Sequence, residues 1–426
     1  MNLADWLARI EAGQPRGSDG IELGLDRVAA VKQRLSQKET CPVILVGGTN
    51  GKGSTCAMLE RILHCAGYRV GLYTSPHLIR YNERVRVDLC SASDEALCRA
   101  FERVEAARGE AQLTYFEFGT LAAWEVFATE SLDVIILEVG LGGRLDATNV
   151  YMPMVSIVTT VDLDHMEFLG PDREAIGREK AGIYRSGVAA ICGDDQPPQT
   201  LLDIATSVGT RLSRIGRDYG FERLENQWSF WSRRTDGEIV RRSGLAHPGL
   251  RGSRQLSNAA TVLQALDLLR NDLPVAMKDI RQGLIETELA GRFQLLPGRP
   301  LIVLDVAHNP QAARVLAQNL GETGFHPRTW AVFGMLADKD IDAVIAAVKD
   351  RVSTWLPCGL EGRRAASADL LAERLSVAGC ALGPGFASPA QALAHARAEA
   401  GEDDRILIFG SVLTVAAALV ALGRAT

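Results

Sequence analysis

The feature that most constrains the fold is a repeated alternation of short apolar runs with helical patterns. The run PVILVGG (42–48) ends in glycines, and a helical pattern follows it at 52–67. Further apolar runs of strand length occupy 69–77, 132–140, 155–161 and 187–193. Strands that alternate with helices run parallel and have helices on both faces of the sheet. The N-terminal part is therefore predicted to be an α/β domain with a mostly parallel sheet.

A second alternation begins after a cluster of Gly, Pro and Arg at 290–300. Apolar runs at 301–310 and 329–335 each lead into a helical pattern, the second from Asp338, and a last strand and helix start lie in RILIFGSVLTV. A chain of 426 residues exceeds what one core usually serves. We predict a phosphate-binding-loop domain at 1–289 and a smaller Rossmann-like α/β domain at 290–426.

The polar stretch 196–245 interrupts the first domain. It suggests antiparallel strands or a long excursion, because the strand–helix alternation stops there. A helix is expected to resume at 257–269 with Ser257 as its N-cap.

Composition excludes several classes of protein. The net charge of −6 argues against a general nucleic-acid binder, and eight cysteines without a C-x-x-C pair indicate buried free thiols in a reducing cytosol. The N-terminus has no signal-peptide pattern. Ile406–Gly423 is long and uncharged, but Gly410-Ser411 divides it, which favours a strand, turn and helix over a membrane span.

The stretch GGTNGKGST (47–55) predicts a phosphate-binding loop. It lies between a buried strand and a helix, where backbone N–H groups and the helix N-terminus attract anions and Lys52 can reach terminal phosphates. The alternative is a plain glycine-rich turn. Gly53 separates Lys52 from Ser54 and moves the hydroxyl about 100° around the helix axis, so the metal contact is expected to come from elsewhere.

Polar side chains at the ends of three apolar runs are candidate metal ligands. Glu138 ends one strand, His165 follows another in VDLDHMEFLG, and Ser75 follows a third in YTSPH. Open α/β sheets bind ligands at this edge, and oxygen ligands with one imidazole suit Mg²⁺. For Glu138 the alternative is an ion pair with Arg144. Lys180, in the helical segment REAIGREKAGIY, is interpreted from composition alone as a solvated charge.

Several motifs resemble one family. GTNGKGST, TSPHLIRYNERV, TYFEFGTLAAW, LEVGLGGRLDATN, DLDHMEFLG, REKAGI, LDVAHNP and GMLADKD are similar to the folylpolyglutamate synthases, and more closely to the bacterial bifunctional dihydrofolate synthase/folylpolyglutamate synthases of the Mur ligase superfamily. The matches run from about Glu22 to Ser411. The resemblance implies a Mur ligase central-domain fold in the first domain, and a loop in which Gly53 is normal.

The resemblance also implies roles for individual residues. The ATP contacts would be Thr49, Asn50, Gly51, Lys52, Gly53, Ser54, Asn258, Arg292 and Asp305. The magnesium ligands, at two sites, would include Ser75, Glu138, His165 and a carbamate on Lys180. The pteroate-binding residues would be Glu22, Leu23, Gly24, Leu25, Thr114, Tyr115, Phe116, Glu117, Leu145, Asp146 and Ala147. His308 would lie near the incoming glutamate and join Lys52, Glu138, His165 and Lys180 as a catalytic residue.

The implied reaction joins L-glutamate to dihydropteroate and to tetrahydrofolates, at the expense of ATP, in a cytoplasmic monomer with no nucleic-acid or membrane partner. Val306 stands where many relatives have glycine, a change we expect to be tolerated. Three alternatives stay open: a monofunctional folylpolyglutamate synthase, another Mur-type amino-acid ligase, and a non-enzymatic ATP-gated module. A membrane-anchored protein that uses Ile406–Gly423 is a fourth.

Overall fold

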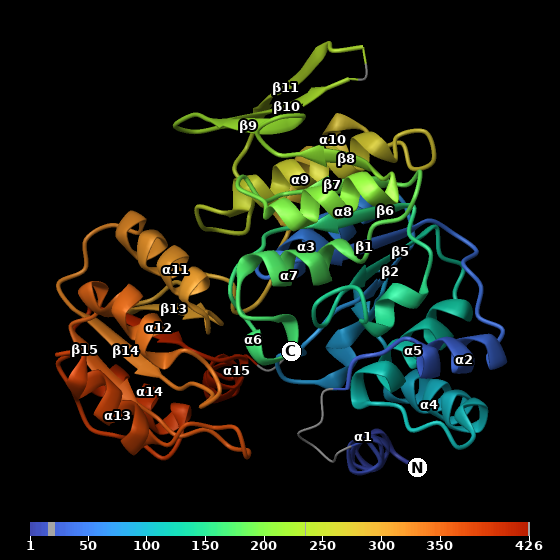
Figure 1. The fold of residues 1–426 in the computed structure, drawn as a ribbon. Helices are drawn as coiled ribbons and strands as arrows, with labels where there is room; N and C mark the ends of the chain where they lie inside the picture. Colours follow the sequence, from blue (N-terminus) through green and yellow to red (C-terminus); the bar gives the residue numbers. More distant parts are fainter. Residues whose placement is uncertain (16–21, 235, 425–426) are drawn as a thin grey trace. The chain divides into compact units, whose positions relative to one another are not determined.

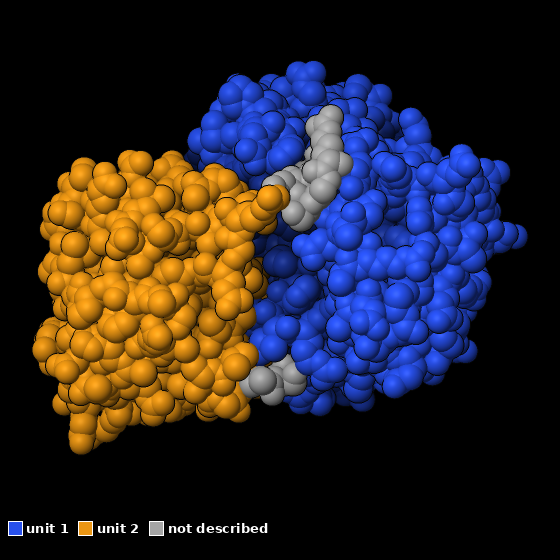
Figure 2. Space-filling view, turned by 90° about the horizontal axis from the view of Figure 1, so that it is seen from below, with its two compact units in different colours: residues 1–249, 256–287 blue, residues 250–255, 288–426 orange. Residues whose placement is uncertain are grey.

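The computed structural model describes residues 1–15, 22–234 and 236–424. The chain divides into two compact units, which Figure 2 shows in different colours. Unit 1 comprises 1–249 and 256–287, and unit 2 comprises 250–255 and 288–426. How the functions divide between the predicted domains, 1–289 and 290–426, stays a proposal.

An eight-stranded sheet forms the centre of unit 1. Its order is β4-β3-β2-β5-β1-β6-β7-β8, and only the β2–β3 and β3–β4 pairs are antiparallel. The strands are β1 (Val43–Gly47), β2 (Val70–Tyr73), β3 (Val85–Val87), β4 (Cys90–Ser91), β5 (Val134–Glu138), β6 (Val155–Val158), β7 (Ala189–Cys192) and β8 (Arg211–Arg214). Strands β1, β5 and β6 are buried along their whole length, which explains their unbroken apolar runs. The predicted mostly parallel sheet is confirmed.

Helices cover this sheet (Figure 1). They are α1 (Leu3–Ala12), α2 (Asp26–Arg34), α3 (Lys52–Cys65), α4 (Asp94–Arg108), α5 (Tyr115–Ala128), α6 (Met166–Leu169), α7 (Arg173–Ala181), α8 (Gln199–Val208), α9 (Gln255–Leu268) and α10 (Met277–Glu286), with 3₁₀ turns η2 (Tyr81–Arg84) and η3 (Ala147–Val150). Helix α3 packs against α10, α4 against α5, and α7 against α8. The start of α9 corrects the sequence analysis: Ser257 lies inside the helix and is not its N-cap.

The polar stretch at 196–245 holds more than one kind of structure. Helix α8 and strand β8 continue the main sheet, and an antiparallel sheet of order β11-β10-β9 follows. Its strands are β9 (Tyr219–Arg223), β10 (Trp228–Arg233) and β11 (Ile239–Leu245). Trp228 and Phe230 are buried, and the Ser232 hydroxyl donates to Gln264 of α9 at 2.8 Å. The predicted antiparallel strands are confirmed for 219–245 only.

Unit 2 is built on a five-stranded sheet of order β12-β13-β16-β14-β15, parallel except for β12. Its strands are β12 (Gln294–Leu296), β13 (Leu301–Asp305), β14 (Thr329–Phe333), β15 (Thr354–Pro357) and β16 (Arg405–Phe409). Its helical segments are α11 (Pro310–Glu322), α12 (Ile341–Val348), η4 (Lys349–Arg351), α13 (Ala368–Val377), α14 (Pro389–Glu399) and α15 (Val412–Ala421). Helix α12 begins later than expected because Asp340, not Asp338, is its N-cap.

Two expectations from composition can be compared with the structure. No helix in the described part of the chain is long and apolar enough to cross a bilayer, and Ile406–Gly423 forms β16 and α15. All eight cysteines are free thiols. Only Cys56, Cys192 and Cys358 are buried, however, and Cys90 is exposed. The expectation of buried thiols is therefore wrong for the other five.

Candidate functional site: a nucleotide loop beside a ring of polar strand ends

The glycine-rich loop joins β1 to α3 and follows a path that only glycine allows. Gly48 has φ +140°, and a Cβ there would lie 1.9 Å from Thr159 Oγ1. Gly51 has φ +90°, and a Cβ there would lie 2.7 Å from Asn258 Oδ1. Side chains cannot occupy such positions without a shift of the backbone. The second contact also brings Asn258, a predicted ATP residue of α9, against the loop.

Lys52 is the first residue of α3 and curls back over the loop. Its Nζ donates to the carbonyl oxygens of Gly48 at 3.0 Å and Thr49 at 3.3 Å. The helix contributes the positive end of its dipole at the same place. A cation and a helix N-terminus at the end of a central strand are features that suit the binding of phosphate groups.

The backbone N–H groups of Thr49 and Asn50 are used within the protein. The first donates to Thr160 O at 2.7 Å and the second to Thr160 Oγ1 at 3.1 Å. An anion nest in this loop therefore has to use N–H groups from Gly51 onward, at the start of α3. ATP contacts by Thr49 and Asn50 stay a prediction.

Two of the candidate metal ligands meet at the carboxyl ends of neighbouring strands. Glu138 is the last residue of β5 and is 3% exposed. The backbone N–H of Ser75, two residues after β2, donates to Glu138 Oε2 at 3.2 Å. Arg144, the alternative partner of Glu138, forms an ion pair with Glu179 at 2.9 Å. The pairing of β2 with β5 is what places Ser75 beside Glu138.

Lys180 is buried, which makes the interpretation of a solvated charge wrong. It is 4% exposed near the end of α7. Burial and the positive charge of Lys52 lower the pKa of Lys180 to about 7, although the charges of Asp164 and Asp146 act to raise this pKa. Lys52 is therefore close enough to Lys180 for its charge to act on the buried amine.

His165 follows Asp164 directly and is the N-cap of α6. Its backbone is left-handed, with φ +49°, and its Nε2 lies 3.8 Å from Asp164 Oδ1. Since Asp164 acts electrostatically on Lys180, the histidine, the aspartate and the lysine belong to one region. The turn after β6 thus brings His165 to the same sheet edge as the glycine-rich loop.

The chemistry of these side chains limits the metal that they could hold. No group of three or more His, Cys, Asp or Glu side chains suited to a metal ion occurs in the described residues. The candidates are one carboxylate, one imidazole, one hydroxyl and one amine, and an amine becomes an oxygen ligand only as a carbamate. This set suits Mg²⁺, which takes most of its ligands from phosphates and water, and does not suit an all-protein cage.

The predicted pteroate segments 22–25 and 114–117 are joined by an arginine that sequence reasoning missed. Arg27 Nε donates to both carboxylate oxygens of Glu117, at 2.9 and 2.7 Å, and its Nη1 donates to Glu22 Oε1 at 2.6 Å. Thr114 and Glu117 form a capping box at the start of α5. The pattern T-x-x-E predicts this capping box from the sequence, whereas no local pattern indicates that Arg27 contacts these segments.

The third predicted segment, 145–147, is ordered by its own aspartate. Asp146 is 3% exposed and accepts hydrogen bonds from Leu141 N at 2.8 Å and Thr148 Oγ1 at 2.6 Å. Burial raises the pKa of Asp146. Its carboxylate thus shapes the loop between β5 and η3. A direct contact of this side chain with a pterin stays a prediction.

Aromatic rings lie close to the second segment. The Phe116 ring covers Gly140, where a Cβ would come within 2.6 Å of it, and lies 5.8 Å from the Tyr73 ring. The Arg84 guanidinium lies over the rings of Tyr81 at 5.4 Å and Tyr115 at 5.5 Å. Flat rings of this kind suit a flat heteroaromatic ligand.

His77 is a second residue that sequence reasoning missed. Arg84 Nε donates to His77 Nδ1 at 2.8 Å. Burial, together with the charge of Arg84, lowers the pKa of His77 to about 4. His77 is thus a neutral imidazole at physiological pH, and its Nδ1 acts as an acceptor.

In unit 2 the predicted residues gather at the carboxyl end of β13. Asp305 accepts hydrogen bonds from Phe293 N at 2.9 Å and Ala307 N at 2.8 Å, and burial raises its pKa to about 6 although Arg292 and His308 act to lower it. His308 Nδ1 donates to Val306 O at 2.8 Å. Val306 is not among the described residues with positive φ, so valine is accommodated there. Roles for Arg292, Asp305 and His308 stay predictions.

Comparison with known proteins now assigns a class. Residues 46–266 match the family described as Mur ligase middle domain, and residues 291–412 match the family described as Mur ligase, glutamate ligase domain. The first match alone spans more than half of the chain. The fold and the matches therefore define a Mur-type ligase.

Individual relatives narrow this class. An Escherichia coli K12 protein named dihydrofolate synthase/folylpolyglutamate synthase is 44% identical over 415 residues, 97% of this chain and 94% of the relative. A structure of E. coli FolC in complex with DHPP and ADP has a TM-score of 0.93 and 43% identity, and covers 99% of this chain and 98% of that chain. A bifunctional folylpolyglutamate synthase/dihydrofolate synthase with Mn, AMPPNP and L-glutamate bound has a TM-score of 0.90, at 43% identity and coverage of 99% and 98%. The chain belongs to the dihydrofolate synthase/folylpolyglutamate synthase family of Mur ligases.

Proposed function

We propose that this protein is an ATP-dependent amide ligase that adds L-glutamate to 7,8-dihydropteroate and to the γ-carboxylate of tetrahydrofolates. The main support is that the glycine-rich loop follows β1, Glu138 ends the neighbouring strand β5, and the charge of Lys52 in that loop acts on the buried Lys180. The similarity to dihydrofolate synthase/folylpolyglutamate synthases over nearly the full length supports the choice of substrates.

The proposed chemistry has two steps. An oxygen of the substrate carboxylate attacks the γ-phosphorus of ATP, the bond from this phosphorus to the β–γ bridging oxygen breaks, ADP leaves, and an acyl phosphate forms. The uncharged α-amine of glutamate then attacks the acyl carbon, loses a proton, and the tetrahedral intermediate expels phosphate. Lys52 and the N-terminus of α3 stabilise negative charge on the phosphoryl oxygens during transfer.

Ser75, Glu138, His165 and a carbamate on Lys180 are the residues that would hold magnesium, at two sites. Bound magnesium would supply Lewis-acid neutralisation of the phosphates. A pKa of about 7 leaves a large neutral fraction of the Lys180 amine at physiological pH, which is the form that reacts with CO₂. An ordinary lysine, with a pKa of 10.5, has almost none of this form.

His308 is proposed to help place the incoming glutamate, and Asn258, Arg292 and Asp305 are proposed to contact ATP. We further propose that the protein acts as a monomer in the cytoplasm, with small molecules as its partners. Light scattering after gel filtration would return the mass of one chain, and a dimer mass would contradict this.

The decisive experiment measures ADP release by the purified protein with ATP, Mg²⁺ and L-glutamate. Turnover with both 7,8-dihydropteroate and tetrahydrofolate is expected. Turnover with tetrahydrofolate alone would indicate a monofunctional folylpolyglutamate synthase and withdraw the first reaction. ADP release that does not depend on either acceptor and glutamate would overturn the ligase assignment.

A further inference from the structure

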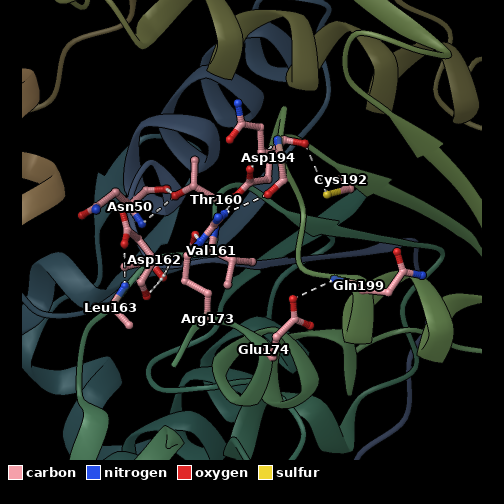
Figure 3. Close-up of polar contacts among 12 residues, drawn as sticks. Asn50, Thr160, Val161, Asp162, Leu163, Arg173, Glu174, Cys192, Asp194 and Gln199 are labelled. Carbon is pink, nitrogen blue, oxygen red and sulfur yellow. Dashed lines mark hydrogen bonds and ion pairs between the residues drawn. The ribbon is translucent and has the colours of Figure 1, made fainter. Parts of the chain in front are cut away.

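Val161 is a buried position whose backbone is held by two side chains. It lies three residues beyond the end of β6. Its N–H donates to Asp194 Oδ2 at 2.7 Å, and its C=O accepts from Arg173 Nε at 2.9 Å (Figure 3). A buried peptide group without partners would destabilise the fold by a few kcal/mol. Asp194 and Arg173 therefore supply the two backbone hydrogen bonds that a neighbouring strand would supply within a sheet.

Asp194 and Arg173 also bind one another, and we call the pair the Val161 brace. Arg173 Nη2 donates to Asp194 Oδ2 at 3.3 Å and to Gln196 O at 2.9 Å. Asp194 Oδ1 accepts from Gln196 N at 2.9 Å, and the residue is 5% exposed. Arg173 is the first residue of α7, and Asp194 lies two residues after β7. The brace thus joins a helix start and a strand end through charge-assisted hydrogen bonds.

The residues on either side of Val161 are fastened to the ATP loop. Thr160 accepts hydrogen bonds from Thr49 N at 2.7 Å and from Asn50 N at 3.1 Å. Asp162 N donates to Thr49 Oγ1 at 3.0 Å. In Figure 3, Asn50 and Asp162 lie on one side of Val161 and Asp194 lies on the other. Val161 therefore lies between two residues, Thr160 and Asp162, that hydrogen-bond to the loop, and its own peptide groups are bound by the brace.

We propose that Arg173 and Asp194 are positioning residues for nucleotide binding. By fixing the peptide groups of Val161 they keep Thr160 and Asp162 in register with Thr49, and so keep the loop in its binding conformation. Without the brace the segment would populate other conformations, and nucleotide binding would have to order it, which weakens affinity. The inference rests on the proposed function only in taking this loop as the ATP site.

The test is calorimetric titration of the whole protein with ADP and Mg²⁺, which needs no catalytic turnover. Arg173→Met and Asp194→Ala are expected to raise the Kd for ADP about 10-fold, and Arg173→Lys, which keeps a donor, by roughly 3-fold. Arg173 is 40% exposed on its side chain, so its variants are expected to fold even where Asp194→Ala does not.

Asp404→Ala is the matched control. Asp404 is also buried, accepts from Gly401 N at 2.8 Å and pairs with Arg328 at 3.0 Å, but it lies at the amino end of β16. Its loss is expected to lower the melting temperature and leave the Kd for ADP unchanged.

Two results would overturn the brace: a Kd for ADP within about two-fold of wild type in folded Arg173→Met, or an equal rise in Asp404→Ala. A wild-type protein that binds ADP but catalyses no glutamate addition would overturn the proposed function alone. A wild-type protein that does not bind ADP would overturn both.

Discussion

At the scale of single residues, the site depends on two lysines with different surroundings. Lys52 lies over the ATP loop, bonded to its carbonyl oxygens. Lys180 is buried, and the charge of Lys52 acts on it. In the proposed reaction the first lysine would meet phosphate, and the second, with its lowered pKa, would accept CO₂. Sequence context suggested the first, whereas the burial of Lys180 depends on tertiary packing.

Lys52→Ala is expected to lower kcat by at least about 100-fold, because charge on the transferred phosphoryl oxygens would lose the lysine proposed to stabilise it. The fold should survive, since the side chain bonds only loop carbonyls. Initial rates of ADP release and the circular dichroism spectrum give the two readouts. The exposed Lys38→Ala is the control for loss of a positive charge, and near-normal turnover in Lys52→Ala would exclude the proposed role.

Lys180→Met is expected to stabilise the protein at pH 7, by ~1–3 kcal/mol, when CO₂ is excluded. The pKa of Lys180 is about 7 in the folded state, below the ordinary value of 10.5. Between pH 7 and pH 10.5 the unfolded chain therefore binds more protons than the folded protein. The wild type should gain stability as the pH rises from 7 towards 10. Urea unfolding at pH 7 and pH 9 would measure the free energy of unfolding of Lys180→Met and of the wild type. The difference between the two proteins should be smaller at pH 9 than at pH 7. An equal difference at both pH values would refute a lowered pKa of Lys180.

At the scale of elements, the site is an arrangement of strand ends. Strands β1, β2, β5 and β6 bring the ATP loop, Ser75, Glu138 and the His165 turn to one edge of the sheet. These elements were predictable, because buried parallel strands leave apolar runs and glycine-rich turns. The long-range contacts between elements were not predictable: Arg27 bonds Glu117, 90 positions away, Asp194 bonds Val161, 33 positions away, and Arg173 bonds Asp194, 21 positions away.

Arg27→Gln is expected to raise the KM for the pteroate or folate acceptor about 10-fold, with the KM for ATP within about two-fold of wild type. The reason is that Arg27 holds Glu22 against Glu117 and so joins two predicted acceptor segments. Steady-state kinetics with each substrate varied in turn would measure both constants.

Arg34→Gln, on the exposed side of the same helix, removes an arginine that bonds only backbone carbonyls of residues 107 and 108. It should change neither constant. An Arg27→Gln enzyme with an unchanged KM for the acceptor would contradict the placement of the acceptor site at these segments.

At the scale of the whole molecule, two units with separate cores allow two unfolding transitions. ADP with Mg²⁺ is expected to raise the transition of unit 1, because ligand binding to the native state stabilises it. If Arg292 and Asp305 also contact the nucleotide, the transition of unit 2 should rise as well. Differential scanning calorimetry resolves the two. Lys52→Ala is expected to bind the nucleotide more weakly and should therefore show smaller shifts.

An unchanged transition in unit 2 would exclude the nucleotide contacts proposed for Arg292 and Asp305.

The sequence predicted two α/β alternations and the division near 290, since each alternation leaves its own strand pattern. The prediction of local details such as the N-cap of α9 was wrong, because a serine inside a helix resembles an N-cap when only its neighbours in the sequence are considered.

The small antiparallel sheet has a bearing on how the chain behaves in a crowded solution. Within the described residues, β9 and β11 are its outer strands, and outer strands invite pairing with another chain. Strand β11 carries Arg241 and Arg242, and its pairing with β10 shifts register between Trp228 and Phe230. Arg241 pairs with Glu222 and Arg242 with Asp267, and these charged side chains together with the irregular register oppose regular pairing with a further strand. These two features are therefore expected to disfavour the pairing of β11 with another chain.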